Sequence, residues 1–378
     1  MRILLAALLG TILWSGAATA QEMQKMSILT GLKSGTYFRF GQDIAQVISK
    51  ECNAEITVKE SQGSLANLQR LRHEVFSQLA IVQQDTLDYL KTAAAKDVKL
   101  QDMIKNIRYI FPLYSEEVHL VTTKNSGIKK LRDIAGKRVA IGVGESGTYL
   151  TASFILLLSG IDVEQVEIGG ADALRRLLLP ADDANKVDAM FYVAGTPVKL
   201  YTETPGLKDK LAAVTINEPA VLDRYNPAQL TAQDYAWIDE KVDTVKVKSV
   251  LMTYDFVGPQ CLNVGMLANR VKANLQTLKT ETGHAKWAEV DINAPLKGWQ
   301  LYKCVKQYID RPVGPEGERR CAFIETTGAA PGYMPPGQKT TPKAEGGGGS
   351  GGSVCDSAKK SDNPIVQSLC KNLKELQK

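Results

Sequence analysis

This sequence has little of what catalysis, metal binding or nucleic-acid binding needs. It holds three histidines, His73, His119 and His284, whose positions show no metal-ligand spacing. It has no C-x-x-C pair and no dense run of lysine and arginine, and its net charge is only +5. After residue 20, no apolar run reaches the roughly 18 residues that a membrane helix needs. These absences argue against an enzyme, a metal or cofactor protein, a nucleic-acid-binding protein and a channel.

Residues 1–20, MRILLAALLGTILWSGAATA, have the order of a cleaved secretory signal. A positive charge at Arg2 precedes an apolar run, and small residues lead up to Ala20. We therefore expect cleavage before Gln21 and a periplasmic protein that does not insert into the membrane after cleavage.

Six cysteines in an exported chain favour disulfides. We expect local pairs between cysteines that flank one segment, namely Cys304 with Cys321 and Cys355 with Cys370. The two others, Cys52 and Cys261, are either bridged or free, because the sequence does not fix the connectivity.

Short apolar strands alternate with amphipathic helices from Met26 onward. The first run predicts strands at 27–31, 54–60 and 78–83 and helices at 36–51, 64–76 and 85–95. A second alternation covers 137–216, and a long helix is expected at 265–281. This pattern predicts an α/β fold with mainly parallel strands and helices on both faces of the sheet.

Two longer strand-like passages, 106–123 and 244–257, separate these alternations. They predict two Rossmann-like lobes joined by two extended crossings, with a ligand cleft between them. The expected parts are a signal peptide at 1–20, a discontinuous lobe I at 21–116 with 254–324, and lobe II at 117–253. A flexible Pro/Gly/Ser linker at 325–353 and a disulfide-stapled helical tail at 354–378 follow.

The tetrapeptide SGTY occurs at 34–37 and at 146–149, each time between a predicted strand and a predicted helix. Hydroxyls and backbone N–H groups at a helix N terminus bind carboxylates. The alternatives are simple N-capping and, for GVGESG at 142–147, a dinucleotide loop, against which the carboxylate of Glu145 argues. We favour a ligand-binding role for both turns. Their candidate residues are Ser34, Gly35, Thr36, Tyr37, Ser146, Gly147, Thr148 and Tyr149.

Other candidates follow two further predicted strands. Gln83 and Asp85 come after one strand, and Gly195 and Thr196 come after another. Glu145 is the candidate for meeting a positively charged end of the solute. No catalytic or metal-binding residue is predicted.

Four segments together resemble the solute-binding proteins of TRAP transporters of the TAXI type. They are TGLKSGTYFRFGQDIAQVISK, QLAIVQQDTLDY, RVAIGVGESGTYLTASFILLLSGI and DAMFYVAGTPV, and the resemblance covers roughly residues 25–265. It implies a periplasmic two-lobe protein that closes on a small solute, often glutamate-like or another small carboxylate. It also implies an integral-membrane permease as partner. The stretch NAPLKGWQLYKC at 293–304 departs from the Pro-Leu-His-Pro-Gly-like stretch of that family.

Two functions follow. The first is capture of a small carboxylate-containing solute for a TRAP-type transporter. The alternative is a periplasmic sensor or adaptor that binds a membrane receptor or envelope partner through its C-terminal tail.

Overall fold

The computed structural model describes residues 24–312 except 53, 75, 76 and 96. The predicted signal peptide, linker and helical tail lie outside the described residues, as do Cys321, Cys355 and Cys370.

Ten strands form one mixed sheet in the order β2-β1-β3-β10-β4-β7-β5-β6, with β8 on β4 and β9 on β10. The strand bounds are β1 Gln24–Leu29, β2 Ala54–Lys59, β3 Ser77–Gln83, β4 Ile107–Thr123, β5 Arg138–Ala140, β6 Glu164–Val166, β7 Ala189–Ala194, β8 Leu211–Ala213, β9 Asn226–Leu230 and β10 Val242–Tyr254. Strand β1 pairs in parallel with β2 and β3, and β5 pairs in parallel with β6 and β7. The predicted α/β class is confirmed.

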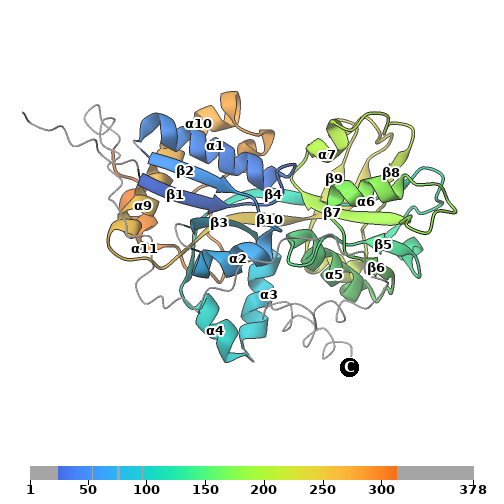
Figure 1. The fold of residues 1–378 in the computed structure, drawn as a ribbon, viewed down its shortest axis with the longest axis horizontal. Helices are drawn as coiled ribbons and strands as arrows, with labels where there is room; N and C mark the ends of the chain where they lie inside the picture. The colour runs from blue at the N-terminus through green and yellow to red at the C-terminus, as the bar shows by residue number, and fades with distance from the viewer. Residues whose placement is uncertain (1–23, 53, 75–76, 96, 313–378) are drawn as a thin grey trace, which may run out of the picture.

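Helices cover both faces of this sheet, with α1, α6 and α7 on one face and α2, α3 and α5 on the other (Figure 1). The α-helix bounds are α1 Thr36–Glu51, α2 Ser64–His73, α3 Gln84–Ala94, α4 Val98–Ile104, α5 Gly147–Ser159, α6 Gly170–Leu177, α7 Lys199–Thr202, α8 Pro219–Leu222, α9 Pro259–Ala273, α10 Leu275–Thr277 and α11 Lys303–Tyr308. Short helical turns are η1 Leu131–Ile134, η2 Leu278–Thr282 and η3 Ala285–Glu289.

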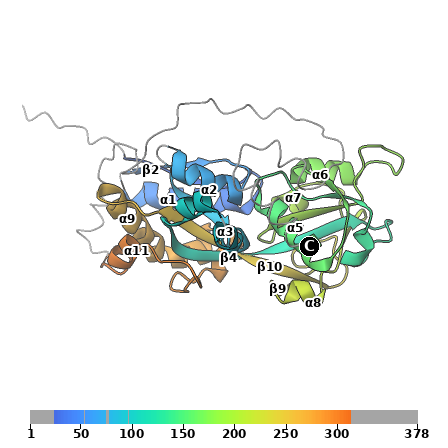
Figure 2. The ribbon, with the colours of Figure 1, turned by 90° about the horizontal axis from the view of Figure 1, so that it is seen from below.

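The two long strands β4 and β10 divide the molecule into two halves. They pair with each other in antiparallel fashion, from Lys246 opposite Glu117 to Tyr254 opposite Ile107. Both strands run from one half into the other (Figure 2). We call residues 24–106 with 255–312 the first half and residues 124–241 the second half. Strands β10 and β4 lie between the parallel strands β1–β3 of the first half and the parallel strands β5–β7 of the second. One sheet therefore runs through both halves.

Helix α1 shows why the first half packs as it does. Its apolar residues Phe40, Ile44 and Ile48 recur at helical spacing, and all three are fully buried. The ring of Phe40 stacks on that of Trp287, with centroids 4.5 Å apart. The chain that returns after β10 therefore completes the core of the first half.

The helix expected at 265–281 is not continuous. Helix α9 already begins at Pro259, and it ends at Ala273 with Asn274 as its C-cap, after which α10 and η2 continue. The side-chain amide of Asn274 donates to Arg270 O and to Glu51 Oε1. Because Asn favours local side-chain to backbone bonds, it interrupts the helix that the apolar periodicity alone predicts.

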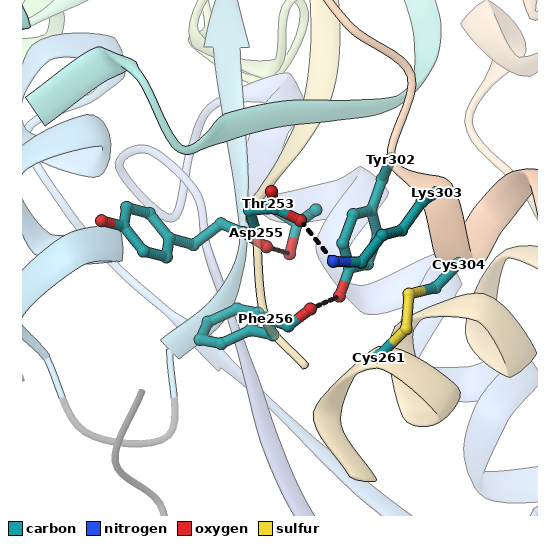
Figure 3. The surroundings of a disulfide bond; sticks show 8 residues. Thr253, Asp255, Phe256, Cys261, Tyr302, Lys303 and Cys304 are labelled. Atoms are coloured by element: carbon teal, nitrogen blue, oxygen red, sulfur yellow. Dashed lines mark hydrogen bonds and ion pairs between the residues drawn. A yellow bond between two sulfur atoms is a disulfide. The ribbon is translucent and has the colours of Figure 1, made fainter. Parts of the chain in front are cut away.

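A disulfide joins Cys261 of α9 to Cys304 of α11, with Cα atoms 5.5 Å apart (Figure 3). Next to it, Tyr302 donates its hydroxyl hydrogen to Phe256 O at 2.9 Å, and Lys303 pairs with Asp255 at 3.3 Å. The predicted pairing of Cys304 with Cys321 is therefore wrong. Proximity in sequence does not decide this pairing, because packing of α9 against α11 brings two cysteines that are distant in sequence within bridging distance. Cys52 is disulfide-bonded as well.

Candidate functional site

A cavity of about 80 Å³ lies where the two halves meet, at the carboxyl ends of the parallel strands. The first half contributes the loops after β1 and β2 and the end of β3, namely Gly31, Leu32, Gly35, Thr36, Tyr37, Gln62, Gly63, Ser64 and Gln83. The second half contributes the loops after β5 and β6 and the end of β7, namely Gly142, Val143, Ser146, Gly147, Thr148, Gly169, Gly170, Tyr192, Val193 and Ala194. Glu116 of β4 lines the cavity between them.

Helices α1, α2 and α6 all begin at this cavity, and glycine is the N-cap of each. These glycines are Gly35, Gly63 and Gly169, and no side chain caps any of the three helices. Ser, Thr, Asp and Asn are the usual caps, because their side chains accept the first free amides of a helix. Glycine caps let a ligand approach the backbone closely, and at α1 and α6 no side chain occupies those amides. The cavity thus offers N–H donors and positive dipole ends to an anionic group.

The two SGTY turns are not equivalent. In the first, Gly35 is the N-cap and the helix begins at Thr36. In the second, Ser146 is the N-cap, and its hydroxyl oxygen accepts the amide of Tyr149 at 3.0 Å. The capping alternative thus describes Ser146, although this residue also lines the cavity. Relative to the tetrapeptide, the helix thus begins one residue earlier in the second copy. For this reason the two copies present different atoms to the cavity.

Three buried polar side chains meet on the first-half side of the cavity. Tyr37 donates its hydroxyl hydrogen to Glu116 Oε2 at 2.9 Å, and Ser64 Oγ lies 3.4 Å from the same hydroxyl. Gln83 also hydrogen-bonds to Glu116, while its Oε1 atom is buried and has no donor. Burial is the main reason that the pKa of Glu116 lies well above its ordinary value.

Hydrogen bonds between the halves close the cavity around its rim. Thr36 donates its hydroxyl hydrogen to Gly195 O at 3.0 Å. The carbonyl oxygen of Glu145 accepts the amides of Leu65 and Ala66, at 3.1 and 3.2 Å. These bonds tie the start of α1 to the end of β7, and the start of α2 to the turn before α5. The structure is therefore the closed arrangement of the two halves.

A third contact between the halves is centred on Asp85. Its Oδ2 atom accepts the hydroxyls of Thr151 at 2.6 Å and Tyr225 at 3.0 Å. Burial raises the pKa of this carboxyl to about 6, although the three hydrogen bonds it accepts act in the opposite direction.

Seven of the thirteen predicted ligand residues line the cavity, and they come from both halves. They are Gly35, Thr36, Tyr37, Gln83, Ser146, Gly147 and Thr148. The other six lie around it without lining it. They are Ser34, Asp85, Glu145, Tyr149, Gly195 and Thr196.

Those six residues have other contacts. Tyr149 is 1% exposed and belongs to the hydrophobic core, and Ser34 hydrogen-bonds to Tyr192. The amide of Thr196 donates to Glu117 Oε2 at 3.0 Å, while Gly195 and Asp85 bind the opposite half as described above.

Glu145 is not the acidic residue that faces the cavity. Its φ of 71° is in the left-handed region, and this conformation directs its carbonyl oxygen to the start of α2. The carboxylate that does line the cavity is Glu116. Of these two acidic residues, Glu116 and not Glu145 therefore lines the cavity.

The sequence carried signals for the residues that were missed. Ser115, Glu116 and Glu117 interrupt an otherwise apolar strand, and acidic residues are seldom buried without a partner or a function. Glycines also precede α2 and α6, as they precede α1. Strand-to-helix turns that contain glycine are frequent anion sites, so the search could have included all of them.

Within residues 24–312, apart from the gaps, no group of three or more His, Cys, Asp and Glu is arranged to hold a metal ion. No helix in this part of the chain is long and apolar enough to cross a membrane.

Two α/β halves, joined by two long strands and in contact around a cavity, define a two-lobe protein with the fold of periplasmic binding proteins. Residues 28–262 match the model of the NMT1-like family. Because this match spans more than half of the chain, the protein belongs to the NMT1-like family.

Solved structures of binding proteins resemble the chain at low identity. The periplasmic binding protein BugD is 13% identical, with 76% of this chain and 94% of that chain covered and a TM-score of 0.49. The substrate-binding protein of an amino acid ABC transporter is 14% identical, with coverage of 76% and 100% and a TM-score of 0.41. The aliphatic sulphonate binding protein SsuA from Escherichia coli is 14% identical, with coverage of 78% and 88% and a TM-score of 0.41.

Proposed function

We propose that this chain is an exported solute-binding protein of the TAXI type. It captures a small carboxylate-containing solute, either a glutamate-like amino acid or a dicarboxylate, and passes it to a TRAP-type membrane transporter. Export rests on the signal-like residues 1–20, and the TAXI assignment rests on the four segments that resemble that family.

One observation supports this function above the others. The cavity is bordered by the starts of α1, α2, α5 and α6, two from each half. No lysine or arginine lines it. Recognition of a carboxylate would therefore use backbone amides and helix dipoles, which need no charged side chain in the cavity.

Burial of the site between the halves explains how capture and release can be coupled. A solute that contacts both halves stabilises the closed arrangement, because its contacts with the second half are lost on opening. The rim bonds Thr36 to Gly195 and Glu145 to α2 form only when the halves meet. Opening breaks them and exposes the helix starts to solvent.

Isothermal titration of the purified protein, stripped of ligand by denaturation and refolding, tests this proposal. The panel is L-glutamate, L-glutamine, L-alanine, succinate, glutarate and 2-oxoglutarate. At least one of these solutes should bind with a one-to-one stoichiometry. Absence of binding to the whole panel by a folded protein would contradict solute capture of this class.

The transporter is tested separately. We expect a gene for a many-helix permease beside the gene of this chain. Proteoliposomes that contain that permease should take up the solute only when this protein and an ion gradient are both present. Equal uptake with and without this protein would refute the assignment to a TRAP-type system.

A further inference from the structure

Glu116 is an acidic side chain in an unusual position. It lies on β4, one of the two strands that pass between the halves, and it is 2% exposed. Its neighbour Glu117 is also buried, but it pairs with Lys286 at 2.6 Å. Successive side chains of a strand point to opposite faces of the sheet. The lysine that neutralises Glu117 therefore lies on the face away from Glu116.

No lysine or arginine in the described part of the chain forms an ion pair with Glu116. Two acidic groups, Asp85 and Glu117, both raise its pKa further. The groups whose hydrogen bonds or charges act on it are neutral or acidic, and Glu117 acts from the opposite face of the sheet. They come from α1, β3, α3, β4 and β7: Tyr37, Gln83, Asp85, Tyr114, Glu117 and Tyr192. A carboxylate in this place has no ion-pair partner among residues 24–312, apart from the gaps in that range.

A second acceptor lies beside it in the same cavity. Gln83 is 2% exposed, and its Oε1 atom has no donor, whereas its side chain also hydrogen-bonds to Glu116. A buried acceptor without a donor costs stability, and native proteins usually pair such atoms. This wall of the cavity therefore offers two acceptor groups, while the starts of α1 and α6 offer uncapped backbone donors.

We infer that Glu116, with Gln83 Oε1, binds the ammonium group of the solute while the helix starts bind its carboxylate. The solute is then a small α-amino acid rather than a dicarboxylate without an amine. The inference rests on the proposed function and narrows it to one of its two solute classes. A dicarboxylate would bring two more negative charges to a cavity whose only charged lining residue is acidic.

Proton exchange accompanies this binding. In the empty cavity, burial favours the neutral carboxyl of Glu116, and an arriving ammonium favours the carboxylate. The carboxyl proton leaves to the buffer, and the bound pair is ammonium with carboxylate. Up to about one proton is therefore released per amino acid bound, and the affinity rises with pH as long as the solute keeps its ammonium. Titrations in buffers of different ionisation enthalpy measure this release.

The decisive experiment compares matched solutes that differ in the amine. L-Glutamate is paired with glutarate and L-alanine with propionate, each titrated into ligand-stripped wild-type protein. At least one amino acid should bind about tenfold or more tightly than its deaminated partner. Glu116→Gln keeps the size of the side chain and should abolish most of this preference. Glu203→Gln, an exposed site that pairs only with Lys199, should leave it unchanged.

Each outcome has one meaning. If no amino acid binds more tightly than its deaminated partner, or if folded E116Q protein keeps the preference, the inference is wrong and solute capture still stands. If no solute of any kind binds, both proposals fail. Thermal unfolding shows whether E116Q protein is folded, and the wild-type comparison decides the question even if it is not.

Discussion

Gly147 illustrates how one residue without a side chain allows the halves to meet. It begins α5 in the second half and lies against Gln83 and Ser64 of the first half. An added Cβ atom would lie 1.9 Å from Gln83 Oε1 and 2.9 Å from Ser64 Oγ. Real Cβ atoms do not approach other atoms so closely. To relieve the clash, either Gln83 moves into the cavity or the halves separate.

Gly147→Ala should therefore weaken solute binding by about tenfold or more, because the closed state becomes less populated. The helix itself should not suffer, since alanine favours helix formation over glycine. Gly144→Ala is the matched control, because its methyl group would come no closer than 3.4 Å to Glu167 Oε2. Equal affinities of the two variants in isothermal titration would contradict this reading of the contact.

Some of the residues at the cavity could be predicted from the sequence, and others could not. The SGTY turns were visible because an identical tetrapeptide appears twice between a strand and a helix. Glu116 was not recognised, because strand alternation alone does not say which of two adjacent glutamates faces a cavity and which meets a lysine. The Lys286 contact that separates them joins residues 169 positions apart.

At the scale of elements, Asp85 joins α3 of the first half to α5 and to the chain after α8 in the second half. Its pKa is raised to about 6, from 3.8 in an exposed aspartate. Between these two values the folded protein binds more protons than the unfolded chain. The stability that protonated Asp85 contributes is thus present below pH 3.8 and is lost as the pH rises through about 6.

Asp85→Asn keeps an acceptor for Thr151 and Tyr225 and carries no charge. Relative to this variant, the wild type should lose about 2 kcal/mol of unfolding free energy between pH 4 and pH 7, since one pKa unit corresponds to about 1.4 kcal/mol. Urea unfolding of both proteins at several pH values measures the difference. Parallel pH profiles of the two proteins would show that Asp85 is not the responsible group.

Elements were predicted well where one periodicity ran without interruption. The sequence predicted a helix at 36–51, and α1 spans Thr36–Glu51. The break at Asn274 and the Cys261 to Cys304 bridge were not predicted. Both depend on contacts between distant segments, since Asn274 bonds to Glu51 and α9 packs against α11. Periodicity in one window carries no information about such contacts.

At the scale of the whole molecule, β4 and β10 are the only sheet connection between the two sets of parallel strands in the described part of the chain. The bonds between the halves at Thr36, Glu145 and Asp85 lie away from these strands. Bending of the two strands would therefore open the cavity without unfolding either half. Solute binding, which favours the closed arrangement, should then shorten the distance between the halves.

Small-angle X-ray scattering of ligand-stripped protein, with and without a saturating solute identified by titration, tests this closure most directly. We expect a larger radius of gyration without the solute, and a smaller one with it that matches the scattering calculated from the closed structure. Glu203→Gln should respond in the same way, and Gly147→Ala should need about tenfold more solute for the same contraction. A radius of gyration that does not change when the protein is shown to be saturated would contradict the account of two halves closing on a small solute.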